Sequence, residues 1–199
     1  TMLAGIDEPT VSAIATKAPS LDFLSFQIYG EIDQLPQLLS RAGYDGPYQL
    51  TEWGPTGHWE SPKTEWGRPI EPSSSQKARD ISRRYNTIIL ADRRRCLGAY
   101  IFLWGQKQER TPTWYSMFLE DGKHTEAVEV MNHAWTGQSP KRHSLQIKSL
   151  TLSGQPASAS VTAQINDQLH AQLALLETKG NPTISWTVCA EVSKALESD

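Results

Sequence analysis

The stretch PYQLTEWG, residues 47–54, decides how this chain is expected to fold. It is a short run of apolar and β-forming residues that ends in a carboxylate, an indole and a glycine, which predicts a strand followed by a turn. Two more runs have the same form, LDFLSFQIYG at residues 21–30 and CLGAYIFLWG at residues 96–105. Near-continuous apolar strands are typical of parallel sheets that are buried on both faces.

Segments with a helical spacing of apolar residues separate these strands. In each of them, apolar side chains recur every three or four positions and so gather on one face of a helix. The expected helices span residues 8–19, 31–43, 73–95 and 124–137. Residues 1–5, TMLAG, have the composition of the end of a further strand. The alternation of strand and helix along residues 1–137 predicts an α/β fold of parallel units.

The pattern changes near residue 138. Beyond it, short alternating runs separated by turn residues predict a small antiparallel sheet. These runs are residues 145–152, 159–165, 171–177 and 183–191. They are too few for a complete sandwich, which usually needs roughly 100 residues. We therefore expect residues 1–137 to be about half of a (β/α)8 TIM barrel, and residues 138–199 to be a truncated, immunoglobulin-like β-sandwich.

The composition argues against several classes of partner. The net charge of −3 over 199 residues gives no electrostatic reason to expect nucleic acid or an anionic membrane. No apolar run approaches the roughly 18 residues of a membrane-spanning helix. The start, TMLAGIDEPT, lacks the pattern of a signal peptide, although a periplasmic or extracellular location is favoured. Cys96 and Cys189 fit neither a disulfide scaffold nor a metal pattern, so no metal or other cofactor is expected.

Each of the three apolar strands ends in a residue suited to a ligand site, namely Tyr29, Glu52 and Trp104. In parallel α/β folds the carboxyl ends of the strands meet at one edge, where ligands bind. We therefore expect a phenol, a carboxylate and an indole at one mouth. Retaining cleavage of a glycosidic bond uses an ionised carboxylate as nucleophile, and flat aromatic rings can stack on the apolar faces of sugars.

The loops that follow the strands carry more aromatic residues. Seven tryptophans are many for this length. Trp53, Trp59 and Trp114 are further candidates for sugar subsites, with His58 between the first two. For each residue taken alone, an ordinary structural interpretation competes with this hypothesis: a tryptophan can belong to the core, and a glutamate or histidine can be a solvated surface residue.

Together, LDFLSFQIYG, PYQLTEWGPTGHWE and CLGAYIFLWGQKQERTPTWYSMF resemble the last strands of the TIM barrel in clan A glycoside hydrolases, in particular the family 2 type catalytic domain that precedes a β-sandwich. The resemblance covers residues 1–137. It implies that Glu52 is the catalytic nucleophile, Tyr29 its hydrogen-bond partner and Trp104 the platform under the sugar. It also implies a retaining hydrolase or transglycosylase that acts on a β-linked oligo- or polysaccharide.

One element of that active site is absent from the sequence. The family's acid/base glutamate usually follows an asparagine at the end of the fourth strand, and no Asn-Glu pair occurs in this chain. We therefore expect the chain to be inactive alone and to need a missing N-terminal half or another subunit. Glu31, Glu60 and Glu109 are candidates for a substitute acid. Two alternatives stay open: a non-catalytic carbohydrate-binding module, and an inactive barrel remnant that packs against another subunit.

Overall fold

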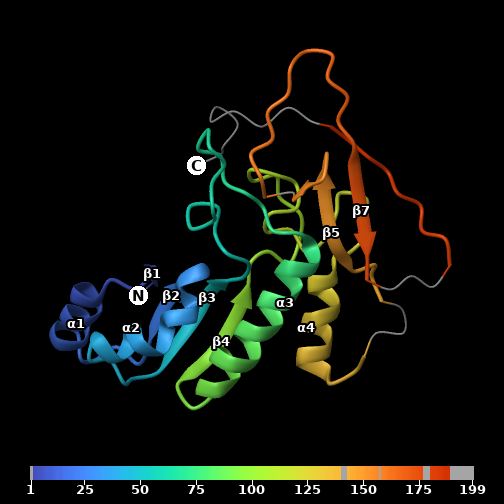
Figure 1. Cartoon of the computed structure of the whole chain (residues 1–199). Coiled ribbons are helices and arrows are strands. Elements are labelled where there is room, and N and C mark those ends of the chain that lie inside the picture. The colour runs from blue at the N-terminus through green and yellow to red at the C-terminus, as the bar shows by residue number, and fades with distance from the viewer. Residues whose placement is uncertain (1, 140–142, 157, 177–179, 189–199) are drawn as a thin grey trace.

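The structure is a computed structural model that describes residues 2–139, 143–156, 158–176 and 180–188. Cys189 and the end of the run predicted at residues 183–191 lie outside the described residues. The described chain forms a four-stranded parallel sheet with helices and a separate three-stranded antiparallel sheet (Figure 1). Among the described residues, no helix is both long and apolar enough to span a bilayer.

The four strands of the larger sheet follow one another in the order β1-β2-β3-β4. They are β1 Met2–Ala4, β2 Leu24–Gln27, β3 Tyr48–Trp53 and β4 Cys96–Ile101. Every neighbouring pair is parallel, so each connection must cross back over the sheet before the next strand begins. The predicted fold class, parallel strands that alternate with helices, is confirmed.

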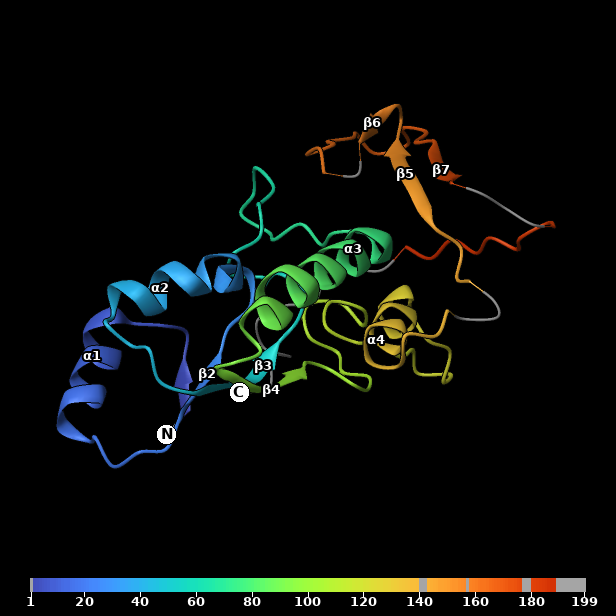
Figure 2. The same ribbon diagram turned by 90° about the horizontal axis from the view of Figure 1, so that it is seen from below.

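The helices of these connections gather on one side of the sheet, as Figure 2 shows for α2 and α3. The α-helices are α1 Glu8–Lys17, α2 Leu35–Arg41, α3 Ser74–Arg84 and α4 Glu126–Thr136. Shorter helical turns are η1 Gly30–Gln34, η2 Tyr85–Ile89 and η3 Leu90–Asp92. The side chain of Asp7 accepts from Thr10 N at the start of α1, and that of Ser73 accepts from Gln76 N at the start of α3. These are ordinary N-caps for amphipathic helices.

The helix predicted over residues 31–43 is two elements instead of one. A 3₁₀ turn, η1, runs through Gln34, and α2 begins at Leu35 with Pro36 in its first turn. Proline has no backbone N–H and is tolerated at the first turn of a helix but not inside one. Pro36 therefore separates the two elements, and this leaves η1 directly after Tyr29, beside the carboxyl end of β2.

The core lies between the sheet and its helices. Phe26 and Leu50 from the strands pack in one buried cluster with Leu39 of α2, Ile81 of α3 and Met131 of α4. All five side chains are at most 2% exposed. Burial of one such side chain stabilises the fold by roughly 1.5–3 kcal/mol relative to its exposure, so this layer is the main source of stability.

The opposite face of the sheet and its outer strands are more open. Gln49 Nε2 lies 3.2 Å from the Tyr100 hydroxyl on this face, and Tyr100 is 60% exposed. Leu97 in β4 and Met2 in β1 are exposed to a similar degree. In the described part of the chain, β1 and β4 each have one neighbouring strand. Four strands are half the number of a (β/α)8 barrel, and closure into such a barrel stays a prediction.

The smaller sheet has the order β6-β5-β7, with both strand pairs antiparallel. Its strands are β5 Ile147–Leu152, β6 Gln155–Pro156 and β7 Ala171–Leu175. The strands predicted at 159–165 and, where described, at 183–188 are wrong, because both segments are irregular. Alternation of apolar residues in a run of seven to nine is a weak signal when no partner strand lies beside it. The described strands form one sheet, and a second layer of a sandwich stays a prediction.

Candidate functional site

The side chain of Glu52 lies on the other face of the sheet from the one that strict alternation along β3 predicts. In β3, Tyr48 and Leu50 are buried in the core cluster, and a side-chain period of two would place Glu52 beside them. Glu52 instead lines a pocket at the carboxyl end of the sheet, and Trp53 is buried in the core.

A β-bulge causes this change of face. Phe26 in β2 pairs with Leu50, but the next residue, Gln27, pairs with Glu52. Thr51 is therefore an extra residue in β3, and such a bulge re-aims the side chains that follow it. As a result, the Glu52 carboxylate lies next to the side chain of Gln27.

Two donors hold the Glu52 carboxylate. Gln27 Nε2 donates to Glu52 Oε1 at 2.7 Å, and the Tyr29 hydroxyl donates to Oε2 at 2.7 Å. Burial, followed by the hydrogen bond to Glu52 and its charge, raises the pKa of Tyr29 far above the ordinary value. The phenol therefore stays protonated and remains a donor, and the two donors fix the orientation of the carboxylate. The predicted hydrogen bond between Tyr29 and Glu52 is confirmed.

A pocket of about 580 Å³ opens beside this carboxylate. The carboxyl ends of the strands contribute Gly5 after β1, Tyr29 after β2, Glu52 in β3 and Phe102 after β4. Two loops, residues 54–73 and 105–123, add Trp59, Glu60, Lys107, Glu109 and Tyr115 to the lining. The sequence prediction that strand ends meet at one ligand-sized hollow therefore agrees with this geometry, and the volume is in the range of small-molecule sites.

Aromatic rings form one wall of the pocket around Tyr29. The ring centroids of Trp59, Tyr115 and Phe102 lie 5.4, 5.5 and 6.2 Å from that of Tyr29, all edge to face. Tyr115 is buried, whereas Trp59 is 55% exposed. An exposed indole that borders a pocket is suited to stack on the apolar face of a sugar ring, and the role of Trp59 as a sugar platform stays a prediction.

Trp53 and Trp114 do not offer a ring to the pocket, and their prediction as sugar platforms is wrong. Trp53 is fully buried and stacks on Tyr85 of η2 with an interplanar angle of 23°. Trp114 is 1% exposed, and its Nε1 donates to the carbonyl of Thr56 at 3.1 Å. The bulge turns the first tryptophan into the core, and the second joins the two loops beneath the pocket wall.

Trp104 does not line this pocket either. Its ring is half exposed and packs against Phe118 at 5.2 Å and against Trp135 of α4 at 5.4 Å. Phe102, two residues earlier, faces the pocket instead. The Phe102 N–H donates to the carbonyl of Trp53 at 2.7 Å and so continues the ladder beyond β4. The sequence run IFLWG contains both rings, and its periodicity alone does not say which one faces the ligand edge.

His58 and Glu109 form a second polar group near the aromatic wall. His58 Nε2 lies 3.6 Å from Glu109 Oε1, and Lys107 Nζ lies 2.8 Å from Glu109 Oε2. The His58 ring packs edge to face against Trp59 and Trp114. Glu109 and Lys107 line the pocket, whereas His58 does not. His58 therefore supports the wall, and Glu109 is the carboxylate that lies opposite the strand ends.

A buried lysine fixes the loop that carries Lys107 and Glu109. Lys77 Nζ donates to Glu71 Oε1 at 2.5 Å and to the carbonyl of Thr113 at 2.5 Å. Burial lowers the pKa of Lys77, although the neighbouring Glu71 opposes this effect. An ion pair with further hydrogen bonds is the arrangement that a buried charge requires. The loop 105–123 is thus tied to α3.

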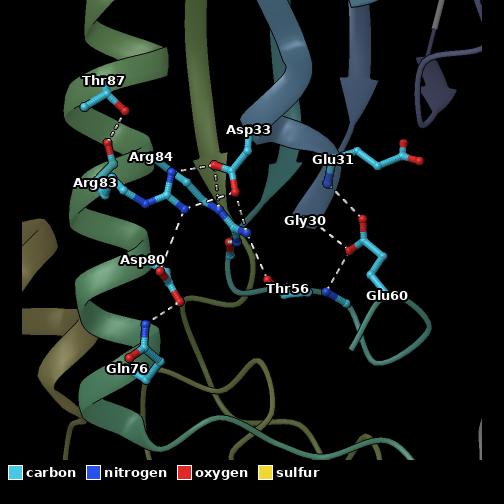
Figure 3. Close-up of polar contacts among 12 residues, drawn as sticks. Gly30, Glu31, Asp33, Thr56, Glu60, Gln76, Asp80, Arg83, Arg84 and Thr87 are labelled. Carbon is cyan, nitrogen blue, oxygen red and sulfur yellow. Dashed lines mark hydrogen bonds and ion pairs between the residues drawn. The ribbon is translucent and has the colours of Figure 1, made fainter. Parts of the chain in front are cut away.

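The other loop is fixed by Glu60, whose carboxylate accepts three backbone N–H groups. These are the N–H groups of Gly30 at 2.7 Å, Glu31 at 2.9 Å and Gly57 at 2.9 Å (Figure 3). A Cβ at Gly30 or Gly57 would lie under 3.0 Å from the carboxylate, so both glycines permit the close approach. The charge also lies at the start of η1, where the N–H dipoles favour an anion. The Glu60 carboxylate therefore anchors this loop to the start of η1 and is not a solvated surface group.

Replacing Glu60 with alanine should loosen the loop that carries Trp59. We expect a loss of about 1–3 kcal/mol, because three N–H groups lose a charged acceptor, and a red shift of the tryptophan emission. Urea unfolding and fluorescence spectra measure both. Glu65→Ala, an exposed residue of the same loop, is the matched control and should change neither. An unaltered stability of Glu60→Ala would show that water replaces the carboxylate at no cost.

A second anchor lies on the other side of η1. Arg84 of α3, which is 3% exposed, donates to the carbonyl of Gly54 at 2.9 Å, to Thr56 Oγ1 at 2.9 Å and to Asp33 Oδ2 at 3.2 Å (Figure 3). Arg83 adds two bonds to Asp33 from the solvent side. The segment after Glu52 is therefore tied to both α3 and η1, which keeps the pocket rim in place without a ligand. The sequence does not reveal these anchors, because all their bonds except the one between Gly57 and Glu60 join residues at least 28 positions apart.

The likeness of this chain to known proteins is one of fold and not of sequence. No protein-family model matches the sequence, and no curated protein matches it. Among solved structures, the fold is similar to a GH39 β-xylosidase from Caulobacter crescentus, with 10% sequence identity and a TM-score of 0.47. That match covers 66% of this chain and 30% of the xylosidase chain. The described residues bring together no group of three or more His, Cys, Asp or Glu side chains that could hold a metal ion.

Proposed function

We propose that this chain carries the nucleophile side of a retaining glycosidase site, and that Glu52 is the nucleophile. The observation that supports it best is the Glu52 carboxylate itself, which accepts hydrogen bonds from Gln27 and Tyr29 and borders a pocket with an exposed indole. A retaining enzyme needs a carboxylate that attacks the anomeric carbon and then leaves again. The two hydrogen bonds fix the orientation of this carboxylate at the pocket, which suits it to attack.

The site does not identify the residue that would donate the proton in this reaction. Retaining enzymes place the acid about 5–5.5 Å from the nucleophile. Glu60 is committed to three backbone N–H groups, so it is not available for proton transfer. Glu109 lines the same pocket but is paired with Lys107. General acid catalysis contributes roughly 10²- to 10⁴-fold, so we expect the isolated chain to act poorly on unactivated glycosides.

A non-catalytic carbohydrate-binding role is the second candidate, and the engagement of Glu60 and Glu109 by other groups favours it. If no group can protonate the leaving oxygen, the same pocket binds a sugar without cleaving it. The two functions differ in one measurable respect. A nucleophile can displace a leaving group that departs without a proton, whereas a binding site forms no covalent bond with its ligand.

The test is covalent trapping by an activated 2-deoxy-2-fluoro-β-glycoside with a dinitrophenolate leaving group. The Glu52 carboxylate attacks the anomeric carbon, the C–O bond to dinitrophenolate breaks, and the electron-poor sugar remains bound as an ester. We expect the mass of the wild-type chain to rise by one fluorosugar, with the adduct on the peptide that contains Glu52. Glu52→Gln should not be labelled, and Tyr29→Phe should be labelled more slowly.

Each other outcome has a definite meaning. An adduct on a different carboxylate, or equal labelling of Glu52→Gln, would contradict the role of Glu52. No adduct together with a change in tryptophan fluorescence on addition of oligosaccharides would favour the binding module. Glu120→Gln, an exposed position outside the pocket, is the control for nonspecific esterification and should behave as the wild type.

A further inference from the structure

We propose, on the basis of the function proposed above, that this pocket accepts neutral or amino-substituted sugars and rejects sugars with a carboxylate or sulfate group. Three observations support this substrate class: the net charge of the pocket, the ion pair of its cation and the use of its hydrogen-bond donors.

The charged side chains of the pocket are mostly acidic. Glu31, Glu52, Glu60 and Glu109 line it, and Lys107 is the one cation among its described lining residues. Four carboxylates and one ammonium give the lining of the pocket a formal charge of −3. A concave site with one predominant sign of charge concentrates its field and acts on the local concentration of a charged ligand.

The one cation is already engaged. Lys107 Nζ lies 2.8 Å from Glu109 Oε2 and 5.7 Å from the centroid of the Phe102 ring. Glu109 already offsets the charge of Lys107, so a ligand carboxylate gains less attraction there than it would from a cation without a carboxylate beside it. The ion pair therefore offers an anionic sugar little net attraction.

Several hydrogen-bond donors at the pocket are also in use. The Gln27 amide and the Tyr29 hydroxyl donate to Glu52. The N–H groups of Gly30 and Glu31, which would suit an anion, donate to Glu60. The lining also supplies four glutamate side chains, whose carboxylate oxygens accept hydrogen bonds. Sugar hydroxyl and ammonium groups supply the matching donors, whereas a uronate or sulfate brings only acceptors and more negative charge.

The experiment compares three β-1,4-linked tetrasaccharides with one backbone: cellotetraose, the glucosamine tetramer and the glucuronic acid tetramer. Tryptophan fluorescence of the wild-type chain is titrated with each at low ionic strength. We expect the first two to bind and the glucuronic acid tetramer to bind at least about tenfold more weakly, as repulsion between like charges in a partly screened site predicts. Added salt should narrow this difference, because it screens the repulsion.

Glu31→Gln removes one pocket charge without touching Gln27, Tyr29 or Glu52, and it should reduce the discrimination roughly threefold to tenfold. Glu120→Gln, outside the pocket, should leave the discrimination unchanged. Equal or tighter binding of the glucuronic acid tetramer would overturn the inferred substrate class while leaving a sugar site in place. Binding of none of the three would contradict the proposed function and the substrate class together. An unchanged discrimination in Glu31→Gln would overturn the electrostatic explanation.

Discussion

Replacing Trp53 with alanine is expected to lower the free energy of unfolding by about 3–5 kcal/mol, which is the usual cost of removing a buried tryptophan. The indole is 0% exposed and stacks on Tyr85, with ring centroids 6.1 Å apart. It packs in the same cluster as Leu50 of its own strand and Ile101 of β4. Domains are stable by only about 5–15 kcal/mol, so the variant should be largely unfolded in mild urea, as circular dichroism would show.

Trp59→Ala is the matched variant, because it removes the same side chain six positions away from a largely exposed place. Its stability should fall by no more than about 1.5 kcal/mol, the value of its edge contacts with Tyr29 and His58. Sugar binding should weaken by roughly fivefold, since a stacked ring contributes on the order of 1 kcal/mol. The opposite pattern, a stable Trp53→Ala that loses binding, would contradict the assignment of the two tryptophans.

This contrast marks the limit of what the sequence could predict for the site. Trp53 and Trp59 are both aromatic, both near Glu52 and both in a glycine-containing segment, so their roles look alike in the sequence. The bulge at Thr51 separates them. A bulge depends on how β2 and β3 pair, and that is information from two strands that no single-strand pattern contains. The same lack of partner information explains why Phe102, and not Trp104, borders the pocket.

Properties that depend on local sequence were predicted well. Runs such as residues 47–54 are apolar enough to require burial between layers, and the helix over residues 124–137 carries its own ending at Gly137, which adopts φ 70°. The position of Tyr29 and Glu52 at adjacent strand ends follows from the parallel topology alone. The support of the site was not predictable in this way, because Glu60 reaches Gly30 and Arg84 reaches Gly54 across long stretches of chain.

Replacing Arg84 with methionine is expected to cost about 1–3 kcal/mol, because it removes the buried guanidinium that the Gly54 carbonyl and Thr56 accept from. The guanidinium bonds the Gly54 carbonyl, Thr56 and Asp33 at once. Methionine keeps the length and apolar stem of the side chain, so the loss reports mainly on these bonds. Because the rim after Glu52 is held by them, we also expect a weaker fluorescence response to sugar. Urea unfolding and the titration described above measure the two effects.

Arg83→Met is the control, since Arg83 bonds the same Asp33 from a position that is 47% exposed. Exposed ion pairs contribute only about 0–1 kcal/mol, so this variant should stay close to the wild type. The pH dependence gives an independent measurement. Burial of Asp33 opposes ionisation, but hydrogen bonds from Arg83 and Arg84 outweigh it and hold the pKa of Asp33 below its ordinary value.

A carboxylate with a lowered pKa in the folded state stabilises the fold above its unfolded pKa, about 3.9 for aspartate. That contribution is lost as the pH falls through the lower, folded value. The wild type should therefore lose stability as the pH falls below about 4, and Arg84→Met should show less of this acid-dependent loss because its Asp33 retains only Arg83. If Arg84→Met and Arg83→Met lost equal stability at neutral pH, the burial of Arg84 would not make its bonds more stabilising than those of Arg83.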